Sequence, residues 1–200
     1  MSIENDYKPW IITAEKLQYS ANILKMQILK SFPTLEEASV DKNTIEALRN
    51  EGIDISRGAL MIAANISAYM LLLGYSLENI IKGALMKKHY DENDLHFFED
   101  FYEMQKSVWG NTNGHDLTKL INKIESFELY KAERTLITRL EHYIRWAGRY
   151  EYSKKNDQYK PEIIAAIKIM NSDSELFNQL KFRLTRKVGI EISSFVINGL

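Results

Sequence analysis

The longest uncharged stretch of the chain is GALMIAANISAYMLLLGYSL, which runs from Gly58 to Leu77. Its length is about that needed to cross a bilayer. However, polar residues interrupt it, and Glu78 and Lys82 continue the same apolar pattern directly beyond it. A helix that is apolar on all sides is also what the centre of a helical bundle requires. We therefore predict a buried core helix from about Ser56 to about His89, and no membrane partner.

Apolar spacing predicts further helices before and after this core helix. In the first, from about Trp10 to Lys30, apolar residues recur at intervals of three and four, and Pro33 is expected to end it. Capping boxes at Thr34 and Asn43 predict two short helical turns, and Gly52 would close the second of them. The remaining expected helical segments are a short one within Asp91–Glu103, one starting near His115, one over Glu128–Gly148, and one from the Ser172 capping box to about Lys187.

Composition supports a single all-α domain over residues 1–200. Three prolines and nine glycines are few for 200 residues, which favours long helices in an up-and-down bundle of four to five helices, with an N-terminal helix and a C-terminal helical extension over 161–200. A net charge of −1 gives no overall attraction to nucleic acid, so such binding would need a local patch. The chain has no cysteine and begins without a signal-peptide pattern, which fits a cytoplasmic location. Its four histidines lack metal-site spacing, so we predict neither metal nor cofactor.

Two charges lie within the apolar core helix, one turn apart. Glu78 and Lys82 form an i, i+4 pair in the favourable order, and their neighbours leave only a narrow polar strip. Burying a charge is costly unless another group pairs with it. We therefore predict a buried polar network of Glu78, Lys82, His115 and Asp116, with His115 or Arg149 as the preferred partner of Glu78. The alternative is an ordinary salt bridge on the helix surface.

A second polar group follows one stripe of the Glu128–Gly148 helix. His142, Arg145 and Arg149 are three and four residues apart, and guanidinium groups suit phosphate oxygens. Arg145 and Arg149 are the predicted phosphate-binding residues, and His142, Arg145 and Arg149 are candidates for catalysis. The same arginines could instead reach Glu78 or Asp116 inside the fold, in which case their role would be structural.

Three segments, in their order along the chain, resemble the HEPN superfamily of higher eukaryote and prokaryote nucleotide-binding domains. They are Leu77-Glu78-Asn-Ile-Ile-Lys82-Gly-Ala-Leu85, Gly114-His115-Asp116-Leu117, and Gly148-Arg149-Tyr150. The resemblance covers roughly residues 58–150. It implies a helical bundle that usually dimerises through its helices, in a bacterial stress or defence system of the toxin–antitoxin type. The aromatic-rich group at Phe97, Phe98, Phe101, Tyr102 and Trp109 adds to the expectation of a homodimer.

Many HEPN proteins are metal-independent ribonucleases that use an Arg followed four to six residues later by a His. This chain has no histidine after His142, so neither Arg145 nor Arg149 completes that motif. The first hypothesis is therefore a non-catalytic HEPN-type module that binds a nucleotide, an RNA or a protein partner. The alternatives are a divergent ribonuclease that uses His142 with Arg145 or Arg149 in reversed order, and a purely structural dimerisation domain.

Overall fold

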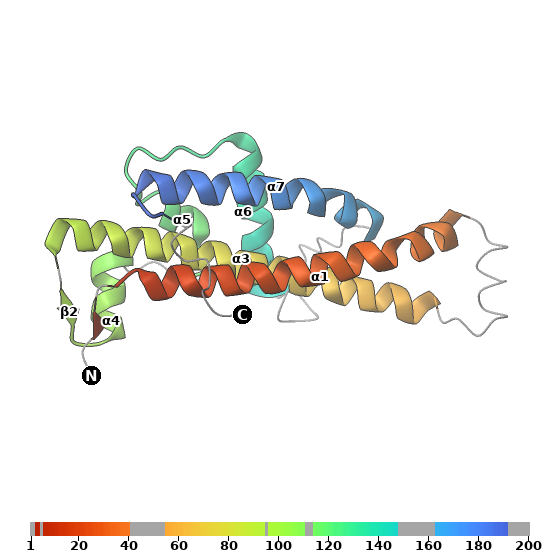
Figure 1. Ribbon diagram of the computed structural model, residues 1–200, viewed down its shortest axis with the longest axis horizontal. Coiled ribbons are helices and arrows are strands. Elements are labelled where there is room, and N and C mark those ends of the chain that lie inside the picture. Colours follow the sequence, from red (N-terminus) through yellow and green to blue (C-terminus); the bar gives the residue numbers. More distant parts are fainter. Residues whose placement is uncertain are drawn as a thin grey trace.

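The computed structural model describes residues 3–4, 6–40, 55–94, 96–110, 114–147 and 163–191. Over these residues the protein is an all-α helical bundle, as predicted (Figure 1). Two π-helical turns, η1 and η2, continue α4 and α6, and two very short strands pair near the N-terminus. The elements are β1 (Ile3–Glu4), α1 (Lys8–Val40), α3 (Ile55–Asn93), β2 (Phe97–Phe98), α4 (Phe101–Met104), η1 (Gln105–Trp109), α5 (Leu117–Ile121), α6 (Lys131–His142), η2 (Tyr143–Ala147) and α7 (Ile163–Lys187).

The two longest helices, α1 and α3, form an antiparallel pair that extends along the whole molecule (Figure 1). Small residues let the two backbones approach, because Ala14 and Ala21 of α1 are buried. The Ser76 hydroxyl of α3 is also buried, and it donates a 2.8 Å hydrogen bond to the Ala14 carbonyl of α1. The central apolar helix therefore has a long partner on one side.

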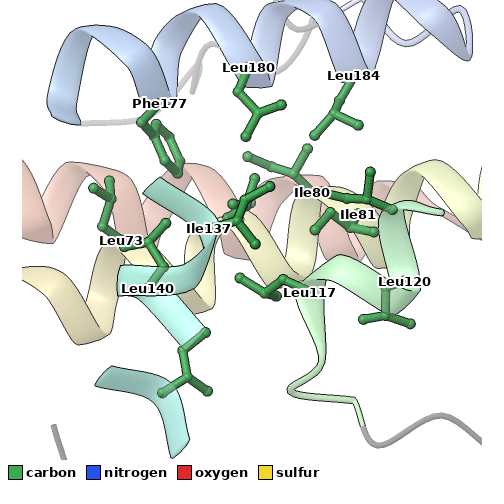
Figure 2. Packing of buried hydrophobic residues seen from close by; sticks show 14 of the residues in the cluster. Leu73, Ile80, Ile81, Leu117, Leu120, Ile137, Leu140, Phe177, Leu180 and Leu184 are labelled. Carbon is green, nitrogen blue, oxygen red and sulfur yellow. The ribbon is translucent and has the colours of Figure 1, made fainter. Parts of the chain in front are cut away.

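Helices α6 and α7 cover α3 on another side. Helix α7 runs alongside the α1–α3 pair, whereas α6 crosses the long axis of the molecule (Figure 1). Their apolar faces meet α3 and α5 in one continuous core (Figure 2). The buried residues at this junction are Leu73, Leu77, Ile80 and Ile81 of α3, Leu117 and Leu120 of α5, Ile137 and Leu140 of α6, and Phe177, Leu180 and Leu184 of α7.

The N-terminal end of α1 lies beside the segment that follows α3. Strands β1 and β2 pair antiparallel, with Ile3 opposite Phe98. Phe98 is fully buried, which anchors the segment. Asp100 then caps α4 by accepting a 2.8 Å hydrogen bond from the Glu103 backbone N–H. Residues 91–103 are therefore held at the same end of the molecule as the start of α1.

Several predicted boundaries were wrong. Helix α1 continues through Pro33 to Val40; proline removes only one helical hydrogen bond, and extended pairing with α3 can offset that loss. Helix α7 begins at Ile163, so the Ser172 capping box lies inside a helix and does not start one. The predicted short helix within 91–103 is divided, because α3 extends to Asn93 and α4 begins at Phe101. The predicted turn from Asn43 to Gly52 and the part of the predicted C-terminal extension after residue 191 lie outside the described residues.

Among the helices that the structure describes, none combines the length and the apolar character that a membrane crossing requires. The interruptions and charges in α3 account for this despite its uncharged stretch.

Candidate functional site

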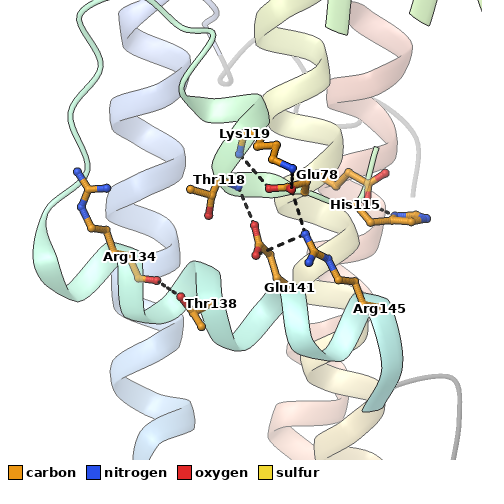
Figure 3. Close-up of polar contacts among 9 residues, drawn as sticks. Glu78, His115, Thr118, Lys119, Arg134, Thr138, Glu141 and Arg145 are labelled. Atoms are coloured by element: carbon orange, nitrogen blue, oxygen red, sulfur yellow. Dashed lines mark hydrogen bonds and ion pairs between the residues drawn. The ribbon is translucent and has the colours of Figure 1, made fainter. Parts of the chain in front are cut away.

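The buried charges of α3 are paired with each other and with a histidine. Glu78 and Lys82 are only 5% and 9% exposed, and Lys82 Nζ lies 2.6 Å from Glu78 Oε1. The other carboxylate oxygen, Oε2, lies 2.9 Å from His115 Nδ1 (Figure 3). The expected contact between Glu78 and His115 is therefore present. Glu78 is shared between a cation on its own helix and an imidazole 37 residues later.

Two tryptophans enclose the ammonium group of this network. Lys82 Nζ lies 5.5 Å from the Trp10 ring centre and 5.1 Å from the Trp109 ring centre. The two rings pack edge to face with their centres 5.3 Å apart. Gly114 adds the remaining wall, since a side-chain carbon at that position would lie 2.9 Å from Lys82 Nζ. The aromatic faces favour a cation there and replace part of the water it has lost.

The network joins four separate parts of the chain: α1 through Trp10, α3, η1 through Trp109, and the segment before α5. An ionised carboxylate can only accept hydrogen bonds, so a hydrogen bond to ionised Glu78 requires the form of His115 that has a proton on Nδ1. The His115 side chain is 33% exposed. Its imidazole is thus oriented by a buried carboxylate while part of the ring reaches solvent, an arrangement that can support proton transfer.

Asp116 belongs to a second, neighbouring cluster on α5 and α6. It caps α5 by accepting a 3.1 Å hydrogen bond from the Lys119 backbone N–H, and its Oδ2 lies 2.9 Å from Lys119 Nζ. Arg145 Nη2 lies 3.3 Å from the same oxygen and 3.7 Å from Glu141 (Figure 3). Glu141 in turn accepts a 2.7 Å hydrogen bond from the Thr118 backbone N–H.

This second cluster is balanced in charge. Partial burial alone would raise the pKa of Asp116, but the hydrogen bonds from Lys119 and the charges of Lys119 and Arg145 outweigh it and lower that pKa. The Arg145 guanidinium lies between two carboxylates, and its Nε is buried without a hydrogen-bond partner. Its positive charge is therefore largely used inside the fold, which leaves little attraction for a phosphate.

The predicted stripe on α6 is only partly brought together. The His142 ring packs edge to face against the next residue, Tyr143, with ring centres 5.9 Å apart. Arg145 lies in η2 and is 37% exposed. Arg149 lies outside the described residues. His142 and Arg145 therefore lie on the continuous α6–η2 helical segment, and the contacts of Arg145 are with Asp116 and Glu141.

Sequence reasoning missed two ion pairs that join α6 to α7. Arg139 donates a 3.0 Å hydrogen bond to the buried Asp173. Burial raises the pKa of Asp173, and the hydrogen bond and charge of Arg139 make this rise smaller. Arg183 pairs with the buried Glu133, and its guanidinium lies 3.9 Å from the Tyr130 ring centre. The sequence did contain a signal for these pairs, because the apolar face of each helix includes one acidic residue, Glu133 in α6 and Asp173 in α7.

A row of exposed apolar side chains on α1 was also missed. Ile12, Tyr19, Ile23 and Met26 are 39%, 60%, 41% and 71% exposed. Their spacings of seven, four and three residues place them on one face, opposite the buried alanines. We call this row the α1 stripe. Its signal was present in the sequence as a second apolar periodicity on the same helix.

The aromatic group after α3 is divided between the core and the surface. Phe98 and Trp109 are buried, whereas Phe97, Phe101 and Tyr102 are 54%, 51% and 68% exposed. The segment also carries six carboxylates between residues 91 and 103 and neither lysine nor arginine. We call residues 91–103 the acidic end.

Among the described residues, no group of three or more histidine or acidic side chains is arranged to hold a metal ion. Comparison with protein families, with curated proteins and with solved structures finds no match. Function must therefore be argued from the chemistry of the surfaces and clusters described above.

Proposed function

We propose that the protein is a non-catalytic helical module of the HEPN type that acts by binding a protein partner. The observation that carries this proposal is the α1 stripe, four large apolar side chains exposed along one face of a long helix. Contiguous exposed apolar surface of this kind marks interaction sites on soluble proteins. A helix face with apolar residues at intervals of three, four and seven is suited to packing against another helix.

Several cations are already paired with carboxylates, which favours a protein over a nucleic acid as the binding partner. Phosphate binding needs cations that are not already neutralised. Lys82 is paired with Glu78, and Arg145 lies between Asp116 and Glu141. Arg139 and Arg183 are also paired, with the buried carboxylates of Asp173 and Glu133. The predicted phosphate site at Arg145 therefore receives little support from its surroundings.

The HEPN assignment rests on the three sequence segments, and one contact is in keeping with it. The Glu78–Lys82 segment and the Gly114–His115 segment, which carry two parts of the resemblance, meet at the hydrogen bond between Glu78 and His115. A shared buried network gives a physical reason why these residue types would occur together.

A divergent ribonuclease is the second candidate, because Glu78 orients the imidazole of His115. A partly exposed histidine held by a buried carboxylate is suited to general acid–base chemistry. Cleavage would also require groups that stabilise the phosphate, and Arg145, the arginine predicted for that role, is already paired with carboxylates.

Two measurements test the proposed function together. A photoreactive phenylalanine analogue placed at Tyr19 in the expressed full chain should form protein adducts in the cell, whereas the same analogue at the exposed Thr135 of α6 should not. Incubation of the purified protein with a mixed RNA pool, without metal, should give neither cleavage nor salt-dependent binding. Cleavage that is lost in His115→Ala, or an absence of protein adducts at Tyr19, would overturn the proposal.

A further inference from the structure

We propose that the α1 stripe binds a helix of a different protein, and that this helix carries two carboxylates, two heptads apart, within an otherwise apolar face. The inference rests on the proposed function, which takes the partner to be a protein. It goes further by giving the secondary structure of the partner, its charge and the spacing of its charged residues.

The α1 stripe and two exposed lysines together have the spacing of a coiled-coil seam. The six exposed residues lie alternately four and three positions apart, and they are Ile12, Lys16, Tyr19, Ile23, Met26 and Lys30. This alternation is the heptad pattern of a and d positions, and both lysines fall at a positions. The buried side of α1 keeps a sevenfold spacing at Ala14, Ala21 and Ile28. One side of α1 therefore packs inside the fold, and the other presents a second seam to solvent. We call the six exposed residues the α1 seam.

The two lysines give the α1 seam a positive charge that nearby groups do not cancel. Among the α1 side chains that the structure describes, Glu15 is the only acidic one, and it pairs with Lys181 of α7. Lys16 and Lys30 form no ion pair with any described side chain. The exposed residues beside the seam are uncharged, and they include Thr13, Ser20 and Asn22. A partner that covers the seam must therefore supply counter-charges within its own apolar face, because burying an ammonium group without one is costly.

The spacing of the two lysines determines the spacing of the partner's carboxylates. Lys16 and Lys30 are fourteen residues apart, which is two heptads. In a parallel pair they face the partner's a positions, and in an antiparallel pair they face its d positions; both kinds of position repeat every seven residues. The facing carboxylates are therefore also fourteen residues apart, whichever way the partner runs. The seam from Ile12 to Lys30 is about 27 Å long at about 1.5 Å per residue, so the partner helix needs about five turns.

A second copy of α1 does not meet this requirement. In a parallel pair each seam lysine faces a lysine or the apolar Ile23 at another a position. In an antiparallel pair each lysine faces a d position, and the d positions carry Ile12, Tyr19 and Met26. Both arrangements leave the ammonium groups without counter-charges. The seam is therefore suited to a different chain.

A lipid surface also suits the seam less well than an acidic helix does. A helix that lies on a membrane carries its lysines on the polar face, beside the apolar one. Lys30 instead lies five full turns from Ile12 in the same row, so it is in line with the apolar residues. Seam lysines of this kind select a partner by charge.

Two designed peptides test the charge requirement directly. Both form amphipathic helices with leucine at the apolar seam positions. They differ only at two seam positions fourteen residues apart, which are glutamate in the acidic peptide and lysine in the basic peptide. Binding of each labelled peptide to the purified full chain is measured by fluorescence anisotropy.

Two variants of the full chain complete the experiment. The reversed variant carries Lys16→Glu and Lys30→Glu. The control variant carries Lys131→Glu and Arg134→Glu, which make the same change in net charge at exposed positions of α6. Circular dichroism checks that both variants are folded.

The wild type and the control should bind the acidic peptide at least about tenfold more tightly than the basic peptide, because opposite charges meet at two positions. In the reversed variant this preference should invert. An effect of net charge alone would change the control in the same way, so inversion confined to the reversed variant locates the contact at the α1 seam.

Photocrosslinking in the cell tests the natural partner. With the photoreactive analogue at Tyr19, the crosslinked segment should belong to a different protein and should contain two acidic residues fourteen positions apart among apolar residues in heptad spacing. The substitutions Lys16→Glu and Lys30→Glu should remove most of these adducts.

Several results would overturn the inference. They are equal binding of the two peptides, no binding of either, a crosslinked segment without the paired acidic residues, or crosslinks from Tyr19 to a second copy of this chain. Protein adducts that persist undiminished in the reversed variant would refute the acidic helix and leave the proposed function standing. An absence of protein adducts, together with cosedimentation of the wild type with phosphatidylglycerol vesicles, would refute both and indicate a lipid surface.

Discussion

At the scale of single residues, Glu78 is the group on which the buried network depends. It pairs with Lys82 and His115, and both contacts disappear if its carboxylate is removed. Glu78→Ala should lower the free energy of unfolding by about 3–5 kcal/mol, because it leaves the Lys82 ammonium buried without a counter-charge. Urea denaturation followed by circular dichroism measures the loss.

A matched control exists on the same helix. Asp91 and Lys87 also form an i, i+4 pair on α3, but the Asp91 side chain is half exposed. Asp91→Ala should cost less than about 1 kcal/mol. If Glu78→Ala and Asp91→Ala lower the free energy of unfolding equally, burial does not increase the contribution of the Glu78 ion pair. Replacing the buried pair together, by Glu78→Leu with Lys82→Met, should recover much of the lost stability.

Asp116 gives a prediction about acid stability. Its pKa lies below the ordinary value of 3.8 in the folded protein, so the ionised carboxylate stabilises the fold. That contribution is fully present above the unfolded value and is lost as the pH falls through the folded value. Asp116→Asn keeps a capping acceptor for α5 but removes the charge. The variant should show a shallower loss of stability between about pH 5 and pH 2 than the wild type. If the urea midpoint falls with pH equally in the variant and in the wild type, the ionised Asp116 carboxylate does not stabilise the fold in this way.

At the scale of elements, close approach between α3 and η2 depends on a glycine. A side-chain carbon at Gly74 would lie 2.7 Å from Ile144 Cγ1 and 3.4 Å from the Leu140 carbonyl. Gly74→Ala gains about 1 kcal/mol of helix propensity but adds overpacking of about 1–3 kcal/mol, so we expect net destabilisation.

Gly83 provides the comparison for this element contact. A side-chain carbon there would lie 2.7 Å from the terminal methyl of the buried Ile11 and 3.3 Å from both Ile11 Cγ1 and Trp10 Cβ. Only the methyl is closer than 3.0 Å, so Gly83→Ala should cost less than Gly74→Ala and have the higher thermal midpoint. A lower thermal midpoint for Gly83→Ala than for Gly74→Ala would show that the contact between α3 and η2 adjusts without cost.

Much of the element pattern could be predicted from the sequence, because apolar periodicity directly reflects the buried face of a helix. The central helix, the α6 face at Leu136 and Leu140, and the α7 face at Phe177 and Leu180 follow this rule. Boundaries were less predictable. Local signals such as Pro33 and the Ser172 capping box were outweighed by packing along neighbouring helices.

The candidate site was predictable only where a charge interrupts an apolar pattern. Glu78 and Lys82 satisfy that condition, and a partner near His115 followed from the cost of burying them. The contact between Arg145 and Asp116 was one of two alternatives that the sequence left open, because pairing between helices depends on their crossing geometry. The α1 stripe was hidden for another reason: one helix carries two apolar periodicities, and only one of them faces the core.

At the scale of the whole molecule, the protein separates its charges from its exposed apolar surface. Charges near the centre are paired internally, as at Glu78, Arg145 and Arg183, whereas the apolar side chains of the α1 stripe are exposed. This division is what an interaction module requires: a rigid interior held by ion pairs and apolar packing, and a surface with unused apolar area.

The measurement that tests this account most directly is photocrosslinking from Tyr19 in the expressed full chain, with and without Ile23→Glu. Ile23 lies near the centre of the α1 stripe and is 41% exposed, so a charge there should not unfold the chain. A photoreactive phenylalanine analogue at Tyr19 should form protein adducts in the otherwise unchanged chain, and Ile23→Glu should remove most of them, because it places a charge within the apolar contact. An absence of adducts without the substitution, or adducts that persist undiminished with it, would contradict the claim that this protein works through the outward face of its first helix.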